Sequence, residues 1–159
     1  MQWLNGTPLG EFVLTMLVSM IPVLELRGGL PFGVALGLAP WQALVAGIIG
    51  NLLPLPFIVV YVRRVFQWMR RHMPRLNGLV ERLEKKAHLG GRKVSKYKYL
   101  GLMIFVAIPL PGTGGWTGAL AAAFLDMPLR KALSSLIAGV CIAGAIVFTI
   151  TYGVTATFF

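Results

Sequence analysis

Long apolar stretches, separated by short polar breaks, dominate the chain. Residues 41–62 and 132–152 are long enough to cross a membrane as helices, because about 20 apolar residues span a bilayer. Four other apolar stretches are much shorter, and residues 12–24 would make a helix only about 20 Å long. We therefore predict that the short stretches pair into re-entrant helical hairpins. The arms would be 12–24 with 30–38 and 99–109 with 116–125, and each hairpin would precede a transmembrane helix.

The order of these stretches repeats within the chain at an offset of about 87 residues. Residues 21–51 and 108–140 both open with Ile-Pro and reach a glycine-rich break, at residues 26–29 in one copy and 109–115 in the other. Each copy then meets a proline near a helix start, Pro40 or Pro128, and enters a long apolar segment. Broken hydrophobic segments at matching places in two halves are typical of a transport site at the bilayer midplane. We predict an all-α membrane protein built as an inverted repeat.

The first long stretch is interrupted by Asn51, Pro54 and Pro56. A proline inside a helix removes a backbone donor and disturbs the carbonyl four residues back, so we expect a kink or an opening there. Asn51 lies next to this point. Its side chain would either contribute to a transport site or satisfy the backbone groups that the prolines free.

Composition agrees with a membrane protein. The 159 residues are 57% hydrophobic and 13% charged, with a mean hydropathy of +0.76. Residues 28–62, 99–125 and 132–159 carry no charge. We expect one membrane domain in the inner (plasma) membrane, in which residues 1–62 form the first repeat and residues 99–159 form the second. The N-terminus has no basic region and carries Glu11, so it does not resemble a cleaved signal peptide.

The net charge of +10 is concentrated in residues 63–98, which hold twelve of the fifteen Lys and Arg residues. A basic loop beside membrane segments follows the positive-inside rule, so we expect a cytoplasmic linker rather than a nucleic-acid site. Within it, residues 75–89 have the apolar spacing of an amphipathic helix. By the same rule, Arg130 and Lys131 are expected on the cytoplasmic side. Residues 99–125 would then start and end on that side, so they must enter the membrane and return. Both termini would lie outside.

Two charged residues occupy the predicted tip of the first hairpin, which also contains Gly28 and Gly29. The tip of a re-entrant hairpin would lie near the middle of the membrane, where ionisable groups are energetically costly and usually functional. A low dielectric disfavours the charged form of a carboxyl group, which makes Glu25 a candidate proton carrier. Arg27 stays charged and could hold a phosphate or carboxylate with its fork of donors. The alternative is a Glu25–Arg27 ion pair that only braces the hairpin.

The second tip has no charge and offers backbone amides instead. Glycine-rich turns and helix N-termini attract anions, and a helix is expected to begin near Trp116. We infer that this tip holds the anionic part of a substrate. The candidate residues are Pro109, Pro111, Gly112, Thr113, Gly114, Gly115 and Trp116.

Other polar residues have simpler interpretations. Asp126 is expected to cap the helix that starts near Pro128, with a transport role as the alternative. Arg130 is expected to anchor to lipid headgroups, and Cys141 to pack between helices. No nucleophile–base grouping, paired cysteines or metal-ligand spacing occurs in the sequence, so we expect neither an enzyme nor a cofactor or metal site.

The two tips carry a resemblance to a known family. Residues 21–31 (IPVLELRGGLP) and 109–118 (PLPGTGGWTG) resemble the small multidrug export family, which is similar to the larger DedA (VTT-domain) superfamily. The resemblance implies two opposed re-entrant hairpins, each followed by a membrane helix, and a transport role. DedA-type members are associated with return of undecaprenyl phosphate across the inner membrane, with proton coupling and with drug resistance. Those members carry two arginines in the second motif, whereas this chain has none between Lys98 and Arg130.

Three functions follow as hypotheses. The first is a transporter or lipid translocase for an amphipathic, phosphate-bearing substrate, with a proton as candidate co-substrate. The second is an exporter of small cationic drugs, and the third is a membrane scaffold that acts through the linker. Membrane lipids are the expected surroundings, and a two-fold homodimer is the simplest assembly.

Overall fold

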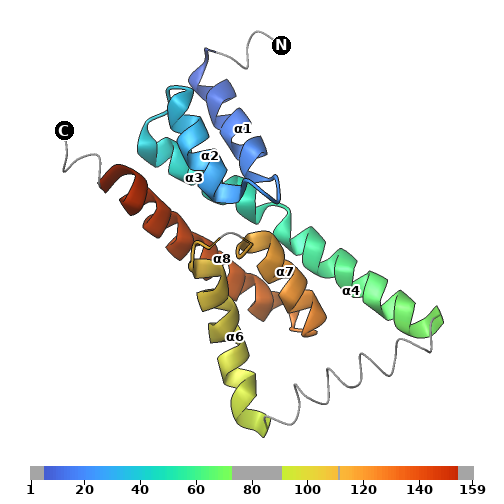
Figure 1. Ribbon diagram of the computed structural model, residues 1–159. Helices are drawn as coiled ribbons and strands as arrows, with labels where there is room; N and C mark the ends of the chain where they lie inside the picture. The colour runs from blue at the N-terminus through green and yellow to red at the C-terminus, as the bar shows by residue number, and fades with distance from the viewer. Residues whose placement is uncertain (1–5, 73–90, 111, 154–159) are drawn as a thin grey trace.

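The computed structural model describes residues 6–72, 91–110 and 112–153, and this part of the chain is helical without a strand (Figure 1). The all-α prediction is therefore confirmed. The helices are α1 (Pro8–Ser19), α2 (Glu25–Ala35), α3 (Pro40–Leu52), α4 (Leu55–His72), α6 (Gly91–Ala107), α7 (Gly115–Phe124) and α8 (Leu129–Phe148), and α8 continues into a π-helical turn, Thr149–Gly153.

Helices α1, α2 and α3 form the first bundle, in which small residues allow close approach. A Cβ on Gly29 would lie 1.8 Å from Oγ of Ser19, and one on Gly50 would lie 2.1 Å from the carbonyl oxygen of Met16. Such small residues at helix contacts are typical of membrane bundles, where van der Waals packing replaces the hydrophobic effect. Thr15 and Ser19 are buried, and their hydroxyls donate to carbonyls of their own helix.

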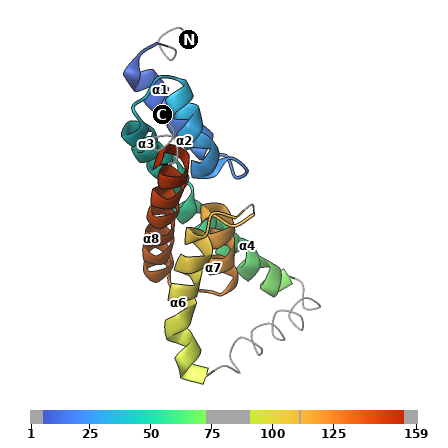
Figure 2. The ribbon, with the colours of Figure 1, turned by 60° about the vertical axis from the view of Figure 1, so that its left-hand side comes forward.

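Helices α4, α6, α7 and α8 form the second bundle, which contains the largest apolar core. Its fully or nearly buried members include Leu55, Val59, Val106, Met127 and Leu136. Helix α8 begins beside α6 and α7 and ends against the first bundle, so it joins the two bundles (Figures 1 and 2). At its far end a Cβ on Gly144 would lie 3.0 Å from Leu26, which places α2 against α8.

Within the described ranges, two helical segments are long and apolar enough to cross a membrane. They are Pro40–Val65, which comprises α3 and most of α4, and Leu129–Tyr152. The first changes from α3 to α4 at Leu53 and Pro54, where the prolines predict the irregularity. Large apolar side chains are exposed on every described α-helix, which is the expected surface of a protein surrounded by lipid. Examples are Leu9, Phe32, Trp41, Phe57, Ile104, Leu120 and Ile137.

The first hairpin does not turn where the sequence predicts. The break lies at residues 20–24, and residues 26–29 are helical, as is Pro31 inside α2. Pro22 explains the shift, because it lacks a backbone donor and disfavours helical geometry in the preceding residue. Gly29 stays helical because it packs against Ser19. The glycines therefore serve helix packing and not the turn.

The helices of the second half follow the prediction more closely, but the predicted role of Asp126 is wrong. Helix α6 begins at Gly91, earlier than residue 99, and α7 begins at Gly115. The prediction that Asp126 caps the next helix is wrong, because Pro128 takes the N-cap position and makes no side-chain hydrogen bond. The predicted amphipathic helix 75–89 lies outside the described residues.

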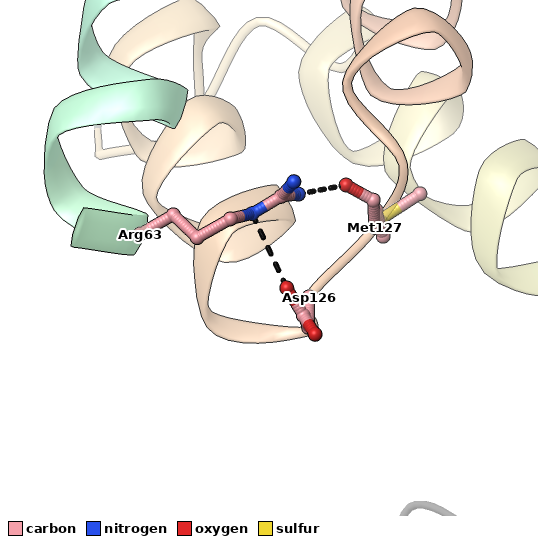
Figure 3. Close-up of polar contacts among 3 residues, drawn as sticks. All are labelled: Arg63, Asp126 and Met127. Carbon is pink, nitrogen blue, oxygen red and sulfur yellow. Dashed lines mark hydrogen bonds and ion pairs between the residues drawn. The ribbon is translucent and has the colours of Figure 1, made fainter. Parts of the chain in front are cut away.

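Asp126 pairs with Arg63 instead (Figure 3). It has a φ of 48°, a left-handed conformation that Asp tolerates, and its Oδ1 lies 3.2 Å from Nε of Arg63. The same guanidinium donates from Nη2 to the carbonyl of Met127, so α4 is joined to the α7–α8 turn. The Asp126 side chain is 65% exposed, and an ion pair so open to solvent contributes at most about 1 kcal/mol. The bond to Met127 contributes more, because hydrogen bonds to charged groups are worth about 1.5–3 kcal/mol.

Gly50 provides a test of the close packing between α1 and α3. We expect Gly50→Ala to lower the free energy of unfolding by about 1–3 kcal/mol, because the new methyl group meets the backbone of α1. Gly101→Ala is the matched control, since Gly101 lies within α6 with nothing near its Cβ position, and it should stabilise by about 0.5–1 kcal/mol. Thermal unfolding in detergent measures both. Equal effects of the two substitutions would contradict this packing.

Candidate functional site

Two charged side chains at the start of α2 contact the first turn of α7 and the segment that precedes it, and we call this arrangement the tip contact. Oε1 of Glu25 accepts a hydrogen bond of 3.2 Å from the backbone amide of Trp116. Arg27 donates from Nη1 to the carbonyl of Leu110 and from Nη2 to the carbonyl of Thr113. The start of α2 thus faces the start of α7, although about 90 residues of chain separate them (Figure 1).

The loop between α6 and α7 presents carbonyl oxygens toward Arg27. Nη2 of Arg27 also lies 3.5 Å from the carbonyl oxygen of Ile108. The Thr113 hydroxyl shapes the loop, because it accepts from the amide of Leu110 at 3.2 Å and can donate to the carbonyl of Ile108 at 2.8 Å. The loop therefore forms a site for a cation, and the guanidinium of Arg27 fills it. The second tip lacks a basic residue of its own and receives one from the first.

The N-terminus of α7 presents amide groups toward Glu25. Gly114 and Gly115 are buried, and the Thr117 hydroxyl accepts from the amide of Gly114 at 2.9 Å. The amide of Trp116, two residues further along the chain, is the donor to Glu25. The positive end of a helix dipole favours a carboxylate at this place. An amide at the tip where the sequence predicts anion binding thus bonds to a carboxylate of the chain itself.

Gly114 is required by proximity and not by its backbone angles. Its φ of 170° belongs to the extended region that any residue adopts. A Cβ at this position would lie 1.9 Å from Oε2 of Glu25, which is far inside contact distance. The absence of a side chain at Gly114 is therefore what allows the carboxylate to reach the helix N-terminus.

Glu25 is held in a costly conformation. It is 7% exposed and has a φ of 48°, in the left-handed region that long side chains rarely adopt. Such strain costs on the order of 1–3 kcal/mol and concentrates at functional sites. The hydrogen bond from the Trp116 amide to the Glu25 carboxylate offsets this backbone strain.

Asn51 lies beside the tip contact with an unsatisfied oxygen. Its side chain is buried, with 3% of its surface exposed, and its Oδ1 has no hydrogen-bond partner. It lines a cavity of about 10 Å³ together with Glu25, Arg27, Gly114 and Gly115. That volume is at the lower limit for one water molecule. The cavity gives Asn51 a place in the candidate site.

The remaining predicted residues do not lie in the tip contact. Gly28 and Gly29 pack against α1 and the turn that follows it, and Gly112 is exposed with open space around its Cβ position. Pro109 lies half-buried in the loop, and Pro111 is outside the described residues. Asp126 pairs with Arg63, and Arg130 is exposed on α8. Among the described residues, no three His, Cys, Asp or Glu side chains gather as a metal site would require.

Sequence reasoning missed the backbone partners of the tip contact and one large surface feature. Trp116 donates from its indole nitrogen to the carbonyl of Met20 at 3.1 Å, so the turn after α1 is also part of the arrangement. Trp116 also lines a mostly apolar groove of about 780 Å³ between α4 and α7. Backbone carbonyls and surface shape leave no residue-type signal, so the sequence could not reveal either one.

The contact between Gly114 and Glu25 can be tested with a double-mutant cycle. We expect Gly114→Ala to cost about 1–3 kcal/mol of unfolding free energy, because the methyl group displaces the carboxylate. In a Glu25→Ala background the same change should cost almost nothing, since the obstructing group is gone. Thermal unfolding of the four proteins measures the coupling, and Gly101→Ala in both backgrounds is the control. Additive effects of Gly114→Ala and Glu25→Ala would mean that the tips do not touch.

Comparisons with known proteins agree with the membrane character of the fold. No curated protein and no solved structure matches the chain. One family does match, over residues 25–146, which is more than three quarters of the chain and includes both sides of the tip contact. The chain therefore belongs to the family described as "Putative small multi-drug export protein", a class of membrane transporter and not of enzyme.

Proposed function

We propose that the protein is a plasma-membrane transporter that moves an amphipathic, phosphate-bearing substrate, of which a lipid such as undecaprenyl phosphate is the leading candidate. The tip contact carries this proposal. A carboxylate and a guanidinium from one bundle occupy an anion site and a cation site on the other bundle. Ionisable groups among apolar helices are costly and mark substrate and proton pathways.

In this proposal Glu25 occupies the place of the substrate's phosphate. Its carboxylate bonds to the amide of Trp116 at the N-terminus of α7, where a phosphate would also be favoured. Protonation removes the charge of Glu25 and weakens that bond. The phosphate then takes the amides of α7, and release of the proton on the other side returns the carboxylate. Asn51, whose oxygen lacks a partner, lies where it can accept a hydrogen bond from protonated Glu25 or from a water in the cavity.

The proposed arrangement in the membrane is two re-entrant hairpins that enter from opposite sides. Helices α1 and α2 have 12 and 11 residues, or about 18 and 16 Å, which is too short for either to span about 30 Å of hydrocarbon. Helix α7, with 10 residues, is shorter still. The tips would meet near the midplane, and the basic linker 63–98 would lie in the cytoplasm.

Export of small cationic drugs is the alternative, and two observations favour it. The family description names multidrug export, and the carbonyls of Leu110 and Thr113 already hold a cation. A drug cation would displace Arg27 from the loop and pair with Glu25. A scaffold function through residues 63–98 stays a prediction, since half of that linker, residues 73–90, is outside the described residues. A homodimer stays a prediction as well.

Substitution of Glu25 tests the transport mechanism directly. In liposomes that contain the full chain, we expect Glu25→Gln to reduce translocation of undecaprenyl phosphate to the rate of protein-free liposomes, because the amide group exchanges no proton. Arg130→Gln, which alters an exposed arginine outside the tip contact, should retain translocation. Parallel liposomes with ethidium measure drug export. Undiminished lipid movement in Glu25→Gln would exclude the proton role, and ethidium transport without lipid transport would select the alternative.

The proposed orientation is tested by labelling single cysteines in intact cells. In a Cys141→Ser background, a cysteine at Ser95 should react with a thiol reagent only after the membrane is permeabilised. A cysteine at Gln2 should react without permeabilisation, because the N-terminus is expected outside. Reaction of the Ser95 position from outside would overturn the orientation.

A further inference from the structure

The groove between α4 and α7 has the size of a binding site. Its volume of about 780 Å³ lies within the range of about 300–1,000 Å³ that is usual for small-molecule sites. Almost all of its lining is apolar. The lining residues are Pro56, Phe57, Ile58, Val60, Tyr61, Val62, Arg64, Trp116 and Leu120.

The charge that lines the groove is positive. Arg64 lines it, and none of the described residues that line it is acidic. The neighbouring Arg63 is engaged with Asp126 and the carbonyl of Met127, whereas Arg64 is exposed. A planar guanidinium binds phosphate oxygens with two parallel hydrogen bonds. The groove therefore combines an apolar trough with a cation suited to a phosphate group.

Trp116 connects the groove to the tip contact. Its backbone amide donates to Glu25, and the same residue lines the groove. Along α4 the groove extends from Pro56 to Arg64, a rise of about 12 Å. A molecule in the groove would therefore place one end at Arg64 and the other near the candidate transport site.

We propose that this groove binds the acyl or prenyl chain of a membrane lipid whose anionic phosphate headgroup pairs with Arg64. The inference rests on the proposed transport function and deepens it, since the groove would be the place where the substrate lipid waits beside the tip contact. The occupant is an anionic lipid because Arg64, a cation, is the one charged residue among the described residues that line the groove. A cationic drug would be repelled by Arg64 and would find no acidic partner among those residues.

Fluorescence quenching by brominated lipids tests this site in the full chain. Replacing Trp3, Trp41 and Trp68 by Phe leaves Trp116 as the single reporter. In phosphatidylcholine vesicles, we expect phosphatidylglycerol with brominated chains to quench Trp116 at about one fifth of the concentration that brominated phosphatidylcholine requires, given the usual contribution of one arginine near a membrane surface. Ordinary contact with surrounding lipid would produce no such preference.

Three variants of the Trp116 reporter complete the test. Arg64→Gln should remove the preference for the anionic lipid, and Lys98→Gln, which removes one positive charge on α6 outside the groove, should keep it. Val60→Phe, which narrows the groove, should weaken quenching by both lipids. Equal quenching by the two lipids, a preference that survives Arg64→Gln, or the absence of quenching by either lipid would each overturn the inference. If translocation still depends on Glu25 in that case, the proposed function stands and only the groove assignment fails.

Discussion

The arrangement of this protein depends on how a buried carboxylate, Glu25, and a half-buried guanidinium, Arg27, find partners. Glu25 and Arg27 are two residues apart on one short helix, yet neither relies on the other for a hydrogen bond in the structure. Each is paired with backbone groups of the opposite bundle. A buried charge without such partners is unfavourable, so the two bundles have to meet at this place. The glycines of the second tip follow from the same requirement, because a side chain at Gly114 would exclude the carboxylate.

The surrounding helices explain how so small a contact can be maintained. The first bundle packs through Gly29, Gly33 and Gly50, and the second through a core of Leu, Val, Ala and Met side chains. Helix α8 joins the two bundles, and Arg63 ties α4 to the turn before α8. The polar tips therefore lie between two packed units whose outer faces are apolar.

The sequence predicted the features that depend on the lengths of apolar runs and on the types of residue. Apolar run lengths indicated an all-α fold with two long helices, and Pro54 indicated the irregularity between α3 and α4. Four site residues that the prediction named, Glu25, Arg27, Thr113 and Trp116, lie in the tip contact. The first break was misplaced because glycines can serve packing or turning, and only the tertiary contact of Gly29 with Ser19 decides between them. Asp126 was misassigned for a similar reason, since its partner Arg63 is distant in sequence. The carbonyl partners of Arg27 could not be predicted, because every residue has a carbonyl.

The central claim is that the guanidinium of Arg27 lies among the carbonyls of the second tip when the protein is in a bilayer. Solid-state NMR can measure this without a substitution, through dipolar recoupling between ¹⁵N-labelled arginine and ¹³C-labelled carbonyls of Leu110 and Thr113. The account predicts nitrogen-to-carbon distances of about 4 Å, as a hydrogen bond to a carbonyl oxygen requires. Absence of recoupling between these sites would place the tips apart and contradict the account.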